Sequence, residues 1–128
     1  MRVRYLYLMV LSATLLGCVG CGSGYHDRIV SSKSSSEWIA TCFFREPTSA
    51  LDDNVTYVST RVIGTPDDNA NHGGIVLEVR GEVNLELEWN DSHHLTISCA
   101  GCSYKSIDFQ VIKVHDLEIS YAGFLDKP

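Results

Sequence analysis

Apolar and polar residues alternate between Val83 and Cys99, and this alternation constrains the fold more than any other feature of the sequence. The first half of the stretch has an apolar side chain at every second position, at Val83, Leu85, Leu87 and Trp89. After turn-forming residues 90–93, the second half repeats the pattern at Leu95, Ile97 and Cys99. A helix would distribute these side chains around its circumference, whereas a strand places them on one face. The stretch therefore predicts a β-hairpin with one buried and one solvated face.

Most of the remaining chain also has the composition and periodicity of strands. We predict them over residues 38–44, 55–63, 75–80, 107–114 and 117–121. In the first strand the inward positions are Trp38, Ala40, Cys42 and Phe44. We predict loops over residues 46–53 and 64–74. A helix within residues 46–53 is an alternative. We expect Gly81 to turn the third strand back into the hairpin.

A chain of 128 residues has room for one domain. Short strands separated by turn signals predict an all-β fold, a small antiparallel β-sandwich or barrel-like meander of about seven strands. A single strongly curved sheet is the alternative.

The N-terminus has the features of an export signal. Arg2 and Arg4 precede an apolar run over residues 6–16, which has the length of a signal peptide and is short for a membrane span. The run ends in Leu15-Leu16-Gly17-Cys18. This segment resembles the lipobox of bacterial lipoprotein signal peptides. The resemblance implies that residues 1–17 are removed and that Cys18 carries palmitate-type acyl chains. The alternatives are an uncleaved N-terminal helix and an ordinary secretory peptide.

The resemblance and the composition together divide the chain into three parts. After the signal peptide (residues 1–17), we expect the lipidated Cys18 and a Gly/Ser-rich flexible tether over residues 18–36, followed by a β domain over residues 37–128. Val19, rather than Asp, follows the lipidated cysteine. In Gram-negative members of the family this implies the periplasmic face of the outer membrane. The membrane is thus the first expected partner, through the N-terminal lipid.

The Cys99-Ala100-Gly101-Cys102 motif has three interpretations. A redox pair should precede a helix, yet strand-like sequence lies on both sides. A metal site would need further ligands such as His72, His93, His94 or Cys42. A structural disulfide suits a small exported domain and is favoured. Four cysteines besides Cys18 are candidates, Cys21, Cys42, Cys99 and Cys102. The favoured bridge is Cys99–Cys102, or Cys42 with either of them, and Cys21 is a candidate intermolecular link.

Other polar groups predict no chemistry. We expect His93 and His94 to be solvated turn residues. We expect Asp67-Asp68-Asn69 to be part of a solvated loop. No nucleophile elbow or phosphate-binding glycine loop is present. We therefore predict no catalytic residue, metal ligand or cofactor. Loss of Arg2 and Arg4 leaves eight basic against 16 acidic residues, which argues against binding of nucleic acid.

The mature part is similar to small exported bacterial proteins of unknown function. The similarity lies in residues 35–41, Ser-Ser-Glu-Trp-Ile-Ala-Thr, and in the apolar-polar strand, acidic turn and Cys-x-x-Cys strand of residues 83–102. It implies no activity. We expect a membrane-anchored lipoprotein whose non-enzymatic β domain binds an envelope component or protein. Alternatives are an inhibitor or immunity-type lipoprotein acting on an envelope hydrolase, and a metal-binding or redox protein using Cys99 and Cys102.

Overall fold

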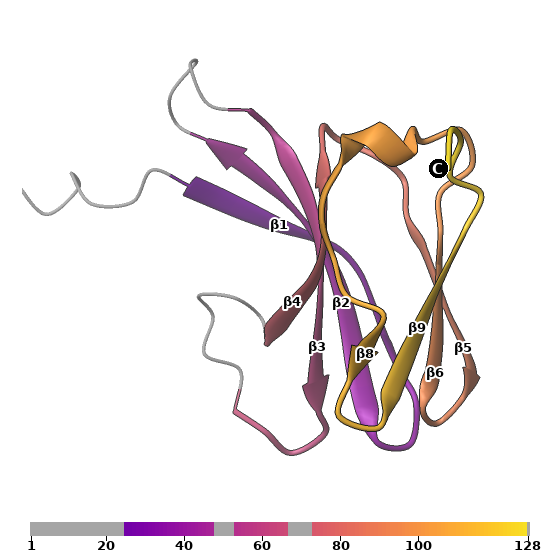
Figure 1. Cartoon of the computed structure of the whole chain (residues 1–128). Helices are drawn as coiled ribbons and strands as arrows, with labels where there is room; N and C mark the ends of the chain where they lie inside the picture. Colours follow the sequence, from indigo (N-terminus) through magenta and orange to yellow (C-terminus); the bar gives the residue numbers. More distant parts are fainter. Residues whose placement is uncertain (1–24, 48–52, 67–72, 128) are drawn as a thin grey trace, which may run out of the picture.

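Two β-sheets pack face to face in the protein, as Figure 1 shows for the computed structural model, which describes residues 25–47, 53–66 and 73–127. The five-stranded sheet has the order β1 (Tyr25–Ser34), β2 (Trp38–Pro47), β3 (Val55–Val62), β4 (Gly74–Arg80) and β7 (Ile107–Gln110). The four-stranded sheet has the order β5 (Glu86–Asp91), β6 (His94–Ser98), β9 (Leu117–Ala122) and β8 (Lys113–Val114). A 3₁₀ turn, η1 (Tyr104–Ser106), precedes β7. The predicted all-β sandwich is confirmed.

The chain changes sheets three times. Strands β1 to β4 form an antiparallel meander, and the chain then crosses to the β5–β6 hairpin. It returns to the first sheet as β7, antiparallel to β4, and crosses again to β8 and β9. Strand β9 runs parallel to β6, so the second sheet is mixed. The prediction that Gly81 folds the third strand back beside the hairpin is wrong. Gly81, at a φ of 93°, lies where the chain leaves one sheet for the other.

Strand β1 corrects the predicted domain boundary. Its residues pair with β2 from Tyr25↔Pro47 to Ser34↔Ile39, across a register shift between Ile29 and Ser31. The flexible tether predicted for residues 18–36 is therefore wrong from Tyr25 onward, and residues 35–37 form the β1–β2 turn. The Ser-rich composition concealed this strand because an edge strand needs little apolar sequence. The signal peptide, Cys18, Cys21 and residues 67–72 lie outside the described residues.

The core lies between the two sheets and follows the predicted alternation. Cys42, Val58 and Leu77 are direct neighbours across β2, β3 and β4, and their side chains are fully buried. From the opposite sheet, the β5–β6 hairpin and β9 contribute their inward-facing side chains to the core. The buried residues in this sheet, or directly beside its strands, are Leu85, Leu87, Leu95, Ile97, Cys99, Leu117 and Ile119. Each large aliphatic side chain buried in this way stabilises the fold by about 1.5–3 kcal/mol.

Strand β2 is buried on both faces, which the sequence pattern did not predict. The expected inward residues, including Trp38 and Phe44, are buried. Phe43 points to the opposite face yet is also fully buried, and its ring stacks on Tyr57 with 5.1 Å between ring centres. The Arg45 guanidinium lies 5.0 Å from the Tyr57 ring centre and forms two hydrogen bonds, of 2.7 and 2.9 Å, with Asp27. This outer cluster covers the second face of the strand.

Truncation of a core residue of the hairpin should destabilise the protein strongly. Leu95 lies in β6, inside the four-stranded sheet, and is 1% exposed. We expect Leu95→Ala to lower the free energy of unfolding by about 2–5 kcal/mol, since the cavity cannot collapse fully. Ile112→Ala, at a side chain 70% exposed, is the control and should change it by about 0.5 kcal/mol or less. Urea denaturation followed by tryptophan fluorescence measures both, and equal losses would contradict the assigned core.

Candidate functional site

Three turns at one end of the sandwich, with the strand ends beside them, bring together two histidines and four carboxylates. The turns connect β1 to β2, β5 to β6, and β8 to β9, and all three lie at the lower end of the molecule in Figure 1. We call this group the histidine–carboxylate cluster; its members are Glu37, Asp91, His93, His94, Asp116 and Glu118. It joins residues of both sheets that are far apart in sequence.

The β5–β6 turn holds the two histidines through local hydrogen bonds. The backbone N–H of His93 donates to Asp91 Oδ1 at 2.8 Å, an arrangement that Asp commonly makes in turns. Ser92 Oγ lies 2.8 Å from His93 Nδ1. The backbone N–H of Glu118 donates to the His93 carbonyl at 2.8 Å, which fixes the turn against β9.

His93 contacts two carboxylates through a single nitrogen. Its Nε2 lies 2.5 Å from Glu37 Oε2 and 2.9 Å from Asp116 Oδ2. The imidazole is one-third exposed, and both carboxylates are more than half exposed. Two negative groups thus converge on one ring nitrogen.

His94 is held differently, with one carboxylate at each nitrogen. Its Nδ1 lies 2.6 Å from Asp91 Oδ2 and its Nε2 lies 2.8 Å from Glu118 Oε2. Hydrogen bonds with Asp91 and then with Glu118 raise the pKa of His94 above its ordinary value. The pKa of Asp91 is lowered, first by the hydrogen bond from the His93 backbone N–H and then by that from His94. Both groups therefore favour their charged forms.

His94 is exposed, as predicted, and His93 is half-buried, but the sequence did not predict that both contact carboxylates. The turn sequence does place them at a hairpin tip, but three of their four carboxylate partners come from other turns and strands. A sequence signal for this contact is absent, because only the pairing of β9 with β6 brings Glu118 opposite His94.

Further hydrogen bonds brace the same end of the sandwich. Ser35 Oγ donates to the Ser92 carbonyl at 3.0 Å and accepts from the Trp38 backbone N–H at 3.0 Å. Trp89 Nε1 donates to the Lys33 carbonyl, also at 3.0 Å. These contacts link the β1–β2 turn of one sheet to the β5–β6 hairpin of the other.

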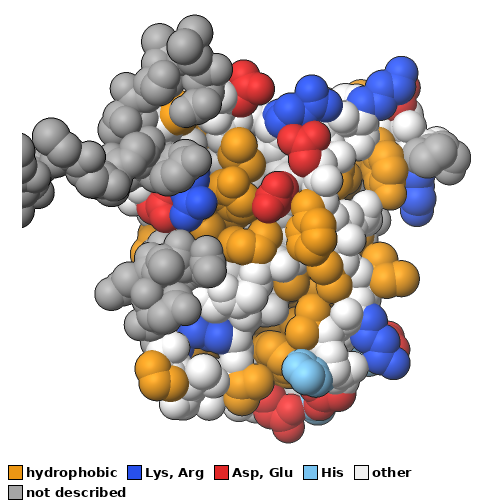
Figure 2. Space-filling view, turned by 60° about the vertical axis from the view of Figure 1, so that its left-hand side comes forward, with side chains coloured by type: hydrophobic (Ala, Val, Ile, Leu, Met, Phe, Trp, Pro, Cys, Tyr) orange, Lys and Arg blue, Asp and Glu red, His pale blue; other side chains and the backbone are white. Residues whose placement is uncertain are grey.

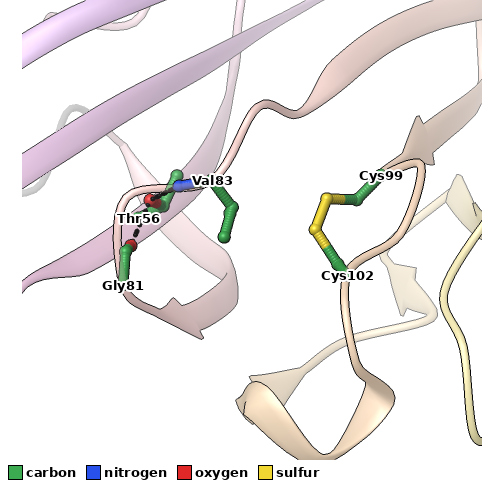
Figure 3. Close-up of a disulfide and its surroundings, with 5 residues drawn as sticks. All are labelled: Thr56, Gly81, Val83, Cys99 and Cys102. Atoms are coloured by element: carbon green, nitrogen blue, oxygen red, sulfur yellow. Dashed lines mark hydrogen bonds between the residues drawn. A yellow bond between two sulfur atoms is a disulfide. The ribbon is translucent and has the colours of Figure 1, made fainter.

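The disulfide lies at the opposite end of β6. Cys99 and Cys102 are bridged, with 5.5 Å between their Cα atoms, so the structure has the first of the pairings that the sequence left open. Figure 3 shows this bridge near Val83, whose backbone N–H donates to Thr56 Oγ1 at 3.2 Å. Thr56 Oγ1 in turn donates to the Gly81 carbonyl at 2.7 Å and so holds the crossing between the sheets. The small loop that the bridge closes gives a stabilisation of about 2 kcal/mol.

The predicted candidate metal ligands are not brought together. Cys99 and His94 lie at the two ends of β6, roughly 16 Å apart at the usual rise of a strand. Cys42 is a free thiol in the core between the sheets and does not bridge to Cys99 or Cys102. His72 and Cys21 are outside the described residues.

An open groove lies near the passage from β7 to β8. It has a volume of about 490 Å³ and is lined by residues that include Tyr104, Ile112 and Phe124. Tyr121, which also lines the groove, donates its hydroxyl proton to the Val111 carbonyl at 2.6 Å, and burial raises the pKa of this phenol. Apolar side chains also gather across the middle of the face seen in Figure 2. The large apolar residues exposed by 44% or more are Ile29, Val30, Val62, Ile63, Phe109, Ile112 and Leu125.

Comparison with protein-family models, curated proteins and solved structures finds no match to this chain. In residues 25–47, 53–66 and 73–127, no helix is long and apolar enough to cross a membrane.

Burial of Cys42 predicts a pH dependence of stability. It raises the pKa of the thiol from 9.0 to about 11, so the folded state binds this proton more tightly than the unfolded state. The resulting stabilisation is complete below pH 9 and is lost as the pH rises to 11. Between pH 9 and pH 11, the free energy of unfolding of the wild-type protein should fall by about 2–3 kcal/mol more than that of Cys42→Ala. Urea denaturation at each pH measures both values. Equal losses in the two proteins would show that the thiol does not titrate in this way.

Proposed function

We propose that the protein is a lipid-anchored protein of the bacterial cell envelope whose β-sandwich is a non-enzymatic binding module. The observation that carries this proposal is the order of basic residues, short apolar run and Leu15-Leu16-Gly17-Cys18 at the N-terminus. Acylation of Cys18 would hold the protein at a membrane, since each buried methylene contributes about 0.8 kcal/mol.

Two features of the folded part support this location. The Cys99–Cys102 bridge is of the kind that persists in oxidising compartments outside the cytoplasm. The first described strand begins at Tyr25, which leaves residues 18–24 between the acylated cysteine and the sandwich. Val19 after the cysteine favours the periplasmic face of the outer membrane in a Gram-negative cell.

The surface supports a role in binding. Ile112, which is 70% exposed, lines the groove together with the aromatic residues Tyr104 and Phe124. Monomeric proteins expose single apolar residues freely, but groups beside a groove are typical of contact sites. We propose this groove as the surface that contacts an envelope component or protein.

Replacement of the acylated cysteine tests the anchor. Cys18→Ser should abolish incorporation of an alkyne-labelled fatty acid and should move the protein from the membrane fraction to the soluble fraction, because the thiol is the only acyl acceptor that the lipobox provides. Cys21→Ser is the matched control and should leave both properties unchanged. Labelling and partition of Cys18→Ser like those of the wild type would refute the proposal.

Photo-crosslinking in the native cells tests the binding surface. A photoreactive residue at Ile112 should yield a discrete adduct with an envelope component, because this side chain is exposed beside the groove. The control position is Glu88, which is exposed on the outward face of β5. Mass spectrometry identifies the product. Absence of a product, or the same product from both positions, would argue against the groove as the contact surface.

A further inference from the structure

We propose that Glu37, His93 and Asp116 form a binding site for a divalent transition-metal ion of the Zn²⁺ type, which ties the two sheets together. This inference goes beyond the proposed lipid anchor and does not rest on it. The three side chains each offer one ligand atom, and these atoms all lie within 4.8 Å of one another.

The ligand atoms converge from three separate turns. Glu37 lies between β1 and β2, His93 between β5 and β6, and Asp116 between β8 and β9. A bound Zn²⁺ lies about 2.0–2.2 Å from each nitrogen or oxygen ligand, so its ligand atoms are somewhat more than 3 Å apart. The observed 2.5 and 2.9 Å from His93 Nε2 to the two carboxylates need only small outward rotations of two exposed side chains.

The charge balance of this group calls for a cation. In either protonation state the imidazole carries at most one proton at Nε2, and that proton can be shared fully with only one carboxylate. Among the described residues, neither Glu37 nor Asp116 forms an ion pair with a Lys or Arg side chain. A divalent ion would neutralise both carboxylates and use the lone pair of Nε2. His94 has no such need, because each of its nitrogens already has its own carboxylate.

The surroundings hold the ligands in place without a metal. Ser92 Oγ, 2.8 Å from His93 Nδ1, is positioned to accept the proton of the second ring nitrogen, as a partner of a metal-bound histidine does. The Glu37 backbone N–H donates to Ser35 Oγ at 3.2 Å, and Ser35 Oγ also reaches the Ser92 carbonyl. The two turns that supply Glu37 and His93 are thereby fixed to each other.

The ligand set indicates which ion binds. Ca²⁺ and Mg²⁺ prefer sites made only of oxygen, whereas imidazole with carboxylates suits Zn²⁺ and neighbouring transition ions. With three protein ligands at the surface, water or a partner's side chain would complete the coordination. Glu37 lies in a turn of the five-stranded sheet, and His93 and Asp116 lie in turns of the four-stranded sheet. Because only the folded protein brings these turns together, the metal should bind the folded state alone and should raise its Tm.

Titration with Zn²⁺ tests the site. The full-length chain, produced without a histidine tag, is stripped with chelator in detergent with its disulfide intact, and is then titrated by calorimetry. We expect one Zn²⁺ per chain and a rise of at least about 10 °C in Tm when free Zn²⁺ is 100-fold above Kd. His93→Gln and Glu37→Gln should each raise Kd at least tenfold, because each removes one of three ligands. His94→Gln is the matched control and should change Kd less than threefold.

Several outcomes would overturn the proposal. The proposal fails if the protein shows no saturable Zn²⁺ binding. It also fails if His93→Gln and His94→Gln lower the Zn²⁺ affinity equally, or if Ca²⁺ binds more tightly than Zn²⁺. Glu37→Gln alters an exposed turn side chain and should fold normally, so it keeps the test decisive if His93→Gln disturbs the hairpin. Far-UV circular dichroism of each metal-free variant verifies the fold.

Discussion

The packing of two apolar sheet faces against each other is the interaction on which the rest of the structure depends. Neither sheet can bury its inner face alone, because each is a single layer. The row Cys42, Val58 and Leu77 therefore packs against the inner faces of the β5–β6 hairpin and β9. This requirement explains why the chain crosses between sheets at Gly81, where pairing β5 beside β4 would have left the hairpin's apolar face exposed.

Once the sheets face each other, their turns meet at the sandwich ends, and the two ends are braced by different chemistry. At one end the Cys99–Cys102 bridge and the Thr56 hydrogen bonds stabilise the crossing. At the other end, polar contacts replace the covalent bond, since Ser35 and the histidine–carboxylate cluster link the turns. A metal ion at His93 would give this end a bridge comparable in effect to the disulfide.

The proposals for the anchor, the groove and the metal ion concern separate parts of the molecule. The proposed acyl chains on Cys18 would act through the chain that precedes Tyr25. The groove lies beside Ile112 and Phe124, and the metal ligands lie on turns. A small sandwich can present several surfaces in this way because its fold is supported by the interior, which leaves the turns and edges free to vary.

The all-β class, the hairpin and its buried face could all be predicted from the sequence, because alternation with a period of two is a local property that survives in the fold. It also indicated a bridge between Cys99 and Cys102, which are neighbours in the chain. The sequence did not show that Tyr25–Ser34 is an edge strand, that Cys42 forms no disulfide with Cys99 or Cys102, or that Glu37 and Asp116 meet His93; these are findings of the folded structure. These features depend on strand order and on contacts between distant turns, and no local pattern of residues encodes which turns become neighbours.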